Sequence, residues 1–410
     1  MLGAILDGLA GLTVGVQALL TLAGLKNLAM MAVGATLIYL GAKRNVEPLL
    51  LVPIGFGCLL VNIPYSELMQ QGLEPATRQT LQLLDLVPDA AKEMAQTETG
   101  FLRTLFQFGV ANELFPLLIF IGIGAMTDFT PLLANPKILL LGAAGQCGVF
   151  VTLLLALAVG FSELQAMSIA IIGACDGPTA IYVASRYAPE LLGPVSVAAY
   201  SYMALVPIIQ PPIMRALTTD RERRIRMPEL KNSVSPAARL VFPIVATVIT
   251  GLIAPKGLPL MGAIMLGNFL RECGVVSRLV KASQNEILSI TTLFLGLAIG
   301  ATMAAENFLR LSTLAIFGLG FFAICLDTVA GVTFGKLMCL FSGGRINPLL
   351  GAAGISAYPM AARVVQVEGQ KHDRQNHLLM HAMGANTGGQ IGSVAAAAVM
   401  LALVHSLAGN

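Results

Sequence analysis

Asp176 lies in the stretch Ile171-Ile-Gly-Ala-Cys-Asp176-Gly177-Pro178-Thr-Ala-Ile-Tyr182, where an ionisable carboxylate stands beside a Gly-Pro helix breaker in a segment long enough to cross a bilayer. A charged side chain at the bilayer centre costs roughly 2.5 to 3.5 kcal/mol on insertion scales, so it is kept where it faces a cavity, a partner or an ion. Pro178 lacks an N–H and disfavours helix before it, which leaves nearby carbonyls free to bind a cation. The stretch predicts an ion site at a broken helix. The alternative is a loop aspartate between two short helices.

The composition places the chain among membrane proteins. Of its 410 residues, 56% are hydrophobic and only 11% are charged, and the mean hydropathy is +0.79. These values are typical of an all-α polytopic membrane protein embedded in a lipid bilayer, and the apolar stretches suffice for roughly ten transmembrane helices. The net charge of +3, without a basic stripe interleaved with aromatic residues, argues against a nucleic-acid partner.

Charge and periodicity divide the chain into four segments. Residues 1–110 hold the first helices and, from residue 64, alternating polar and apolar positions typical of amphipathic helices. Residues 218–287 hold a basic loop with its connecting helices, and the positive-inside rule places this loop in the cytoplasm. The segments 111–217 and 288–410 are predicted to be a first and a second transporter repeat.

The repeats are visible as two pairs of matching stretches. Asp176–Arg186 matches Ala353–Arg363 at an offset of 353 − 176 = 177, and Ile123–Ala125 matches Ile299–Ala301 at 299 − 123 = 176. Repeats in transporters are commonly inverted, with broken or re-entrant helices meeting at an ion site near the midplane. The Asp176 stretch is thereby paired with the stretch that begins at Asn347.

The paired stretch supplies neutral oxygens rather than a second carboxylate. Asn347, Ser356 and, further on, Asn386 carry amide or hydroxyl oxygens, while Asp176 supplies one negative charge. Hard monovalent cations prefer oxygen ligands, and a divalent metal usually recruits more carboxylates. The set suits Na⁺ coupled to H⁺.

Two further polar side chains lie in apolar surroundings. Tyr202 places a phenol in an apolar span, either as a functional group or as a core tyrosine with a satisfied hydroxyl. Arg363 is a cation in a mostly apolar segment and needs an anion, a carbonyl cluster or the interface, so it is a candidate for holding an anionic substrate.

Five motifs, in order along the chain from about Lys43 to the C-terminus, carry a resemblance to a known family. The chain resembles the β subunit of the biotin-dependent sodium-pumping decarboxylases in the stretches Glu47–Gly57, Gly173–Ala180, Ala198–Met214, Ile346–Gly351 and His381–Asn386. The resemblance implies a bacterial cell-membrane subunit that decarboxylates carboxybiotin, exports Na⁺ and takes up a proton. It also implies three partners: a biotin carrier and carboxyltransferase subunit, a small single-span membrane subunit and further copies of the chain. The biotin belongs to the partner and is not attached here, and the acyl substrate is oxaloacetate, methylmalonyl-CoA or glutaconyl-CoA.

The family's functional residues map onto this sequence by motif. The resemblance assigns the essential aspartate to Asp176, the functional tyrosine to Tyr202 and the arginine, expected to hold carboxybiotin, to Arg363. It assigns the remaining sodium-binding residues to Asn347, Gly351, Ser356 and Asn386. The sequence departs from the family pattern at Cys175, at Ala385 and at Asp327, a carboxylate in a span that is usually neutral.

A secondary Na⁺-coupled solute carrier or a Na⁺/H⁺ antiporter with the same architecture is the alternative function. Moving one charge against 100 mV takes about 2.3 kcal/mol, so an exporter needs a driving reaction. The chain contains no ATP-binding P-loop, because Gly331-Val-Thr-Phe-Gly335-Lys336 has the wrong spacing and lacks the Ser or Thr. Composition alone does not separate the pump from the carrier.

Overall fold

The computed structural model describes residues 15–44, 47–69, 99–228 and 234–408. Within these ranges the chain forms helices and connecting loops, without a strand. The predicted all-α class is confirmed. The stretch 64–110, expected to form amphipathic helices, lies mostly outside the described residues.

Among the described residues, fewer helices than the ten expected are long and apolar enough to cross a bilayer. Six helices in the described ranges are long and apolar enough to cross a bilayer: Gly24–Arg44, Pro136–Val159, Pro189–Leu217, Pro236–Ile253, Ser277–Ala301 and Leu311–Phe341. A pair bent by 57°, Phe101–Ala111 with Leu114–Met126, makes a seventh if it is counted as one span. The expected ten are not confirmed, because several apolar stretches form helices that are short or broken, such as Pro48–Val61 and Glu163–Ala174.

Two compact units make up the chain, one of residues 1–115 and 291–313 and the other of residues 116–290 and 314–410. In the first unit, α2 (Leu22–Arg44) pairs with α3 (Pro48–Val61), where a Cβ on Gly55 would come within 2.5 Å of the Gly34 carbonyl oxygen. Small residues allow such close approach of helices in membranes. The described part of this unit also contains α6 (Phe101–Phe106), η1 (Gln107–Ala111), most of α18 (Leu288–Ala301) and α19 (Ala305–Phe308).

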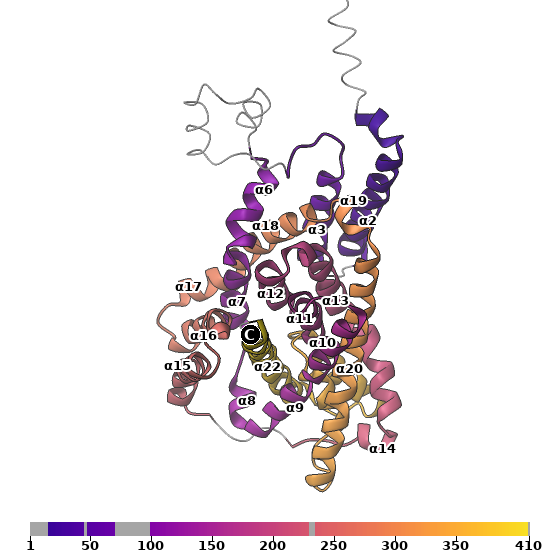
Figure 1. Ribbon diagram of the computed structural model, residues 1–410. Coiled ribbons are helices and arrows are strands. Elements are labelled where there is room, and N and C mark those ends of the chain that lie inside the picture. The colour runs from indigo at the N-terminus through magenta and orange to yellow at the C-terminus, as the bar shows by residue number, and fades with distance from the viewer. Residues whose placement is uncertain (1–14, 45–46, 70–98, 229–233, 409–410) are drawn as a thin grey trace, which may run out of the picture. The chain divides into compact units, whose positions relative to one another are not determined.

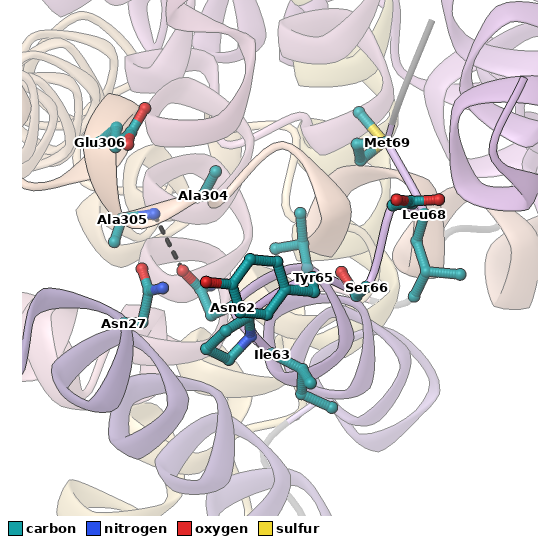
Figure 2. A pocket seen from close by; sticks show the side chains of 13 residues that line it. Asn27, Asn62, Ile63, Tyr65, Ser66, Leu68, Met69, Ala304, Ala305 and Glu306 are labelled. Carbon is teal, nitrogen blue, oxygen red and sulfur yellow. Dashed lines mark hydrogen bonds between the residues drawn. The ribbon is translucent and has the colours of Figure 1, made fainter. Parts of the chain in front are cut away.

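A cavity of about 290 Å³ lies in the first unit at the C-terminal end of α3. Figure 2 shows Asn62 at this cavity, with its Oδ1 accepting a hydrogen bond from the Ala305 N–H at 2.9 Å. The Asn62 Nδ2 donates to the Met303 carbonyl at 2.9 Å. Asn62 therefore ties the end of α3 to the start of α19.

The second unit contains the predicted ion site. Its described elements are most of α7 (Leu114–Met126), α8 (Thr130–Ala134), η2 (Pro136–Ile138), α9 (Leu139–Ala144), α10 (Cys147–Val159), α11 (Glu163–Ala170), η3 (Ile171–Ala174), α12 (Gly177–Tyr187), η4 (Pro189–Leu191), α13 (Leu192–Leu217), α14 (Asp220–Arg223), α15 (Pro236–Ile253), η5 (Pro255–Gly257), α16 (Leu258–Cys273), α17 (Ser277–Ala282), η6 (Ser283–Ile287), most of α20 (Leu311–Phe341), η7 (Pro348–Gly354), α21 (Met360–His372) and α22 (Leu379–Ala408). The long helix α22 lies beside α8 and α9 (Figure 1) and also contacts η7 and α21.

The order of elements repeats within this unit. In each repeat a 3₁₀ segment leads to a short helix and then to a long one: η3, α12 and α13 in the first, and η7, α21 and α22 in the second. The 3₁₀ segments begin at residues 171 and 348, a separation of 348 − 171 = 177, which equals the offset of the sequence match. The four-segment division and the inverted orientation of the repeats stay predictions.

Charged residues fix the C-terminal end of α21, a helix that is not among the candidate membrane spans. Glu368 is buried and accepts two hydrogen bonds from Arg215, of 2.5 and 2.9 Å. These bonds, followed by the contact with Lys371, lower the pKa of Glu368 to about 2 against the opposing effect of burial. Glu368 therefore stays ionised at neutral pH, and the ion pair holds α21 against the end of α13.

Candidate functional site

Asp176 stands where the first broken helix changes direction. The 3₁₀ segment η3 ends at Ala174, and Cys175 follows in the left-handed conformation, with a φ of 53°, which is uncommon for a residue other than glycine. Asp176 then caps α12, because its Oδ1 accepts a 3.4 Å hydrogen bond from the Thr179 N–H. Pro178 lies in the first turn, where its missing N–H costs nothing. Only 5% of the Asp176 surface is exposed, so the break buries a carboxylate.

The second broken segment meets the first through the backbone. The Ser356 N–H donates a hydrogen bond to the Ala174 carbonyl at 3.0 Å, just before Asp176. Ser356 lies directly after η7, in the loop that leads to α21. The predicted meeting of the two broken segments is therefore confirmed.

Helix α22 forms a third wall of the same site. The Ser393 hydroxyl donates to Asp176 Oδ2 at 2.8 Å, and the Ser356 hydroxyl donates to the Gly389 carbonyl at 2.8 Å. The Asn386 amide donates to the Ile355 carbonyl at 2.6 Å. Asp176, Ser356 and Asn386, three of the predicted sodium-binding residues, are thus brought to one place.

Sequence analysis missed Ser393, although a signal for it exists. Asn386, Gly389, Gln390 and Ser393 follow the spacing i, i+3, i+4, i+7, which places them on one face of a helix. A polar stripe in an otherwise apolar membrane helix faces a partner or a cavity. The stripe of these four residues borders Asp176 at one end and the Ser356 loop at the other.

The buried oxygens in the walls of this site include two that have no hydrogen-bond partner in the described part of the chain. They are Thr179 Oγ1 and Asn386 Oδ1, and both residues are fully buried. An unpaired buried polar atom costs about 1 to 3 kcal/mol, unless a ligand satisfies it. With one carboxylate and several neutral oxygens, the chemistry of the site suits a hard monovalent cation.

Asn347 and Gly351 hold the second segment in place. Asn347 Oδ1 accepts a hydrogen bond from the Leu349 N–H at 3.0 Å, while its Nδ2 donates to the carbonyls of Arg223 and Ile225. Gly351 lies so close to α20 that a Cβ would be 1.8 Å from the Gly331 carbonyl oxygen. Neither residue has a described contact with Asp176, and a contact of either with the ion stays a prediction.

Tyr202 is bonded to α20. Its hydroxyl donates to the Phe317 carbonyl at 2.5 Å, and its ring packs against those of Phe317 and Phe321. Tyr200 is the tyrosine beside the Asp176 turn, because a Cβ on Gly177 would lie 2.2 Å from its ring. The described contacts of Tyr202 do not include Asp176.

Arg363 lies in the first turn of α21, seven residues after Ser356 (363 − 356 = 7). The residue is exposed, and its guanidinium makes no hydrogen bond or ion pair within the described ranges. A free guanidinium can bind a carboxylate with two parallel hydrogen bonds. The binding of carboxybiotin by Arg363 stays a prediction.

Comparison with known proteins identifies the family of membrane proteins to which this chain is similar. Residues 26–404 match the family model of the Na⁺-transporting oxaloacetate decarboxylase beta subunit. The chain belongs to this family. It is a membrane-bound β subunit of a multisubunit decarboxylase, as its resemblance implied.

Individual relatives of this β subunit cover nearly its whole length. The methylmalonyl-CoA decarboxylase subunit beta of Propionigenium modestum is 50% identical over 98% of this chain and 100% of its own. The probable oxaloacetate decarboxylase beta chain of Vibrio cholerae is 47% identical over 92% of this chain and 94% of its own. The glutaconyl-CoA decarboxylase subunit beta of Acidaminococcus fermentans is 48% identical over 92% and 93%. These relatives give no support to the solute-carrier alternative.

Asp327 is a buried carboxylate within the candidate span Leu311–Phe341 of this β subunit. It lies on α20, fully buried, and its Oδ1 accepts a hydrogen bond from the Gly148 N–H at 2.5 Å. Gly148 is in the first turn of α10, so Asp327 caps that helix from outside and stabilises its positive end. Asp327 Oδ2 has no hydrogen-bond partner among the described residues.

Proposed function

We propose that this β subunit decarboxylates carboxybiotin presented by a partner subunit and uses the reaction to export Na⁺ with uptake of a proton. The main support is the buried Asp176 carboxylate at the meeting point of two broken helices, next to unpaired neutral oxygens. Such a site binds one monovalent cation and becomes neutral in doing so. A proton neutralises the carboxylate equally well, so Na⁺ and H⁺ compete for it.

The chemical step supplies the driving force in this proposal. Decarboxylation breaks the bond between the carboxyl carbon and the biotin nitrogen and releases CO₂, and the nitrogen, which keeps the bonding electrons, takes up a proton. Arg363 holds the carboxylate of carboxybiotin before the bond breaks. The proton needed is the one that replaces Na⁺ in the site, with Asp176 and Tyr202 as the groups that pass it on.

The partners and the acyl substrate follow from the same proposal. The relatives are named for methylmalonyl-CoA, oxaloacetate and glutaconyl-CoA. We infer that this complex takes one of these three and that a carboxyltransferase subunit, which carries or receives the biotin, makes the choice. A small single-span subunit and further copies of the β subunit complete the assembly in the bacterial cell membrane. A pull-down from native membranes identifies the substrate through the carboxyltransferase that copurifies.

Ser356→Ala and Asn386→Ala should weaken Na⁺ use without abolishing it. Each removes one oxygen from the site, so we expect the apparent KM for Na⁺ to rise about tenfold, equivalent to 1.4 kcal/mol, and high Na⁺ to restore most of the rate. The measurement is Na⁺-dependent decarboxylation in proteoliposomes. Thr247→Val is the control, because the described hydrogen bond of the Thr247 hydroxyl goes to a carbonyl of its own helix, α15.

Arg363→Ala should leave a defect that Na⁺ does not rescue, measured in the same assay. The guanidinium is assigned to the carboxylate of carboxybiotin, so its loss should raise the apparent KM for the carboxylated carrier instead. An equal Na⁺ rescue of Arg363→Ala, Ser356→Ala and Asn386→Ala would show that Arg363 belongs to the ion site.

Tyr202→Phe should lower the rate and change its dependence on pH. Competition between Na⁺ and H⁺ requires the apparent Na⁺ affinity of the wild type to weaken as pH falls. If Tyr202 passes the proton, removal of its hydroxyl alters this dependence. If the hydroxyl only links α13 to α20 through Phe317, the melting temperature falls while the pH profile stays that of the wild type. Na⁺ titrations at several pH values in sealed vesicles, with melting curves, separate the two roles.

A further inference from the structure

Gln146 joins two walls of the cation site and was not predicted from the sequence. It lies between α9 and α10 and is 3% exposed. Its Nε2 is 3.4 Å from the Gly354 carbonyl oxygen in η7 and 3.4 Å from the Gly389 carbonyl oxygen in α22. The side-chain amide thus donates to both the second broken segment and the helix that bonds to Asp176.

The orientation of this amide leaves its oxygen unpaired. An amide nitrogen donates hydrogen bonds, whereas an amide oxygen only accepts them. Two carbonyl oxygens therefore fix the nitrogen on their side, and Oε1 points away from them. Gln146 Oε1 is buried and has no hydrogen-bond partner in the part of the chain that the structure describes.

Gln146 contacts the same backbone carbonyl as Ser356, one of the predicted sodium ligands. The Gly389 carbonyl that accepts from Gln146 also accepts from the Ser356 hydroxyl. Asn386 repeats the same arrangement, because its Nδ2 donates to the Ile355 carbonyl while its Oδ1 is unpaired and buried.

The Gln146 side chain also lies along α22, the helix whose Ser393 bonds to Asp176. A Cβ on Gly392 would lie 3.1 Å from Gln146 Cγ, and the next residue, Ser393, donates to Asp176. Gln146 therefore borders the polar stripe of α22 between Asn386 and Ser393. These residues are seven apart, which corresponds to about 10 Å along a helix.

We propose that Gln146 Oε1 is a ligand of the transported cation beside Asn386 Oδ1, on the polar stripe of α22 that leads to the Asp176 carboxylate. The ligand class is a small monovalent cation, Na⁺ or Li⁺, because an amide oxygen adds a hard ligand without adding charge. This inference rests on the proposed function of the site. The Gln146 amide nitrogen bonds to both Gly354 in η7 and Gly389 in α22. A change in the spacing between these two elements would therefore also move Oε1.

Gln146→Met tests the ligand role with a side chain of similar length that lacks the amide. We expect the apparent KM for Na⁺ to rise about tenfold, as for Asn386→Ala, and the rate at saturating Na⁺ to stay within about threefold of the wild type. We also expect the rise in melting temperature that Na⁺ produces in the purified β subunit complex to shift to correspondingly higher Na⁺ concentrations. This second measurement does not depend on activity.

Two further variants make the test decisive. Gln284→Met is the matched control, because the Gln284 amide donates to the Ala125 carbonyl at 2.6 Å and has no described contact with either broken segment, so its Na⁺ dependence should equal that of the wild type. Gln146→Asn keeps the amide but shortens the side chain by one methylene. If Gln146→Met does not fold, an unchanged Na⁺ dependence of Gln146→Asn overturns the proposal.

The outcomes separate this inference from the proposed function. If Asp176→Asn abolishes the Na⁺-dependent rise in melting temperature while Gln146→Met keeps the Na⁺ response of the wild type, the assignment of Gln146 alone is wrong. If Asp176→Asn keeps the rise, the cation site itself has been misplaced. Loss of the rise in Asp176→Asn, with a shift to higher Na⁺ in Gln146→Met, supports both.

Discussion

Asp176→Asn should abolish both Na⁺ transport and Na⁺-dependent decarboxylation of carboxybiotin in reconstituted vesicles. The substitution keeps the shape of the side chain, and its amide can still bond to Ser393 and Thr179. It removes the one negative charge in the described site that balances a cation. Loss of a charged partner in a buried site costs about 3 kcal/mol or more, which corresponds to at least about a hundredfold loss of Na⁺ affinity.

Two further variants test whether this loss is caused by the missing charge at Asp176. Asp176→Glu keeps the charge but adds one methylene to a tightly packed turn, so it should be partly active at best. Asp373→Asn removes a carboxylate that is paired with Arg226 in another part of the second unit, and it should keep the Na⁺ dependence of the wild type. Coupled pumping by Asp176→Asn near the wild-type rate would refute the assignment of Asp176.

Gly351→Ala should prevent folding of the second unit. The added Cβ would lie 1.8 Å from the Gly331 carbonyl oxygen, and the neighbouring atoms are backbone atoms that no side-chain rotation can move away. Because α20 and η7 touch at this point without side chains between them, we expect little folded protein in the membrane and no rescue by Na⁺. The measurement is the yield of monodisperse protein after extraction in detergent.

Gly318→Ala is the matched control for this prediction. Gly318 also belongs to α20, but a Cβ there would meet nothing within 4 Å, so the variant should fold like the wild type. A folded Gly351→Ala protein with weakened Na⁺ binding would instead favour the direct sodium contact predicted from the sequence.

Local sequence determined the class of the protein and the position of its broken helices. The apolar composition indicates a membrane protein, and the apolar stretches are long enough for spanning helices, which satisfy their own backbone hydrogen bonds in a bilayer. The first broken segment ends at Ala174, and Gly177-Pro178 begins α12 directly after Asp176, because proline is favoured in the first turn of a helix. The repeat offset of 177 recurs as the separation of η3 and η7. Each of these features depends on residues close together in the chain or on simple periodicity.

Tertiary structure decided which oxygens surround Asp176 and which predicted residues have structural contacts instead. Ser393 reaches Asp176 across 217 residues, and Gln146 reaches Gly389 across 243. Asn347 is bonded to the end of α14 at Arg223, and Tyr202 to α20. These contacts depend on how η7, α20 and α22 pack, and that packing is set by the fit of glycines such as Gly351 and Gly331. Sequence spacing specifies the face of a helix that is polar, but only the packed neighbours determine what that face touches.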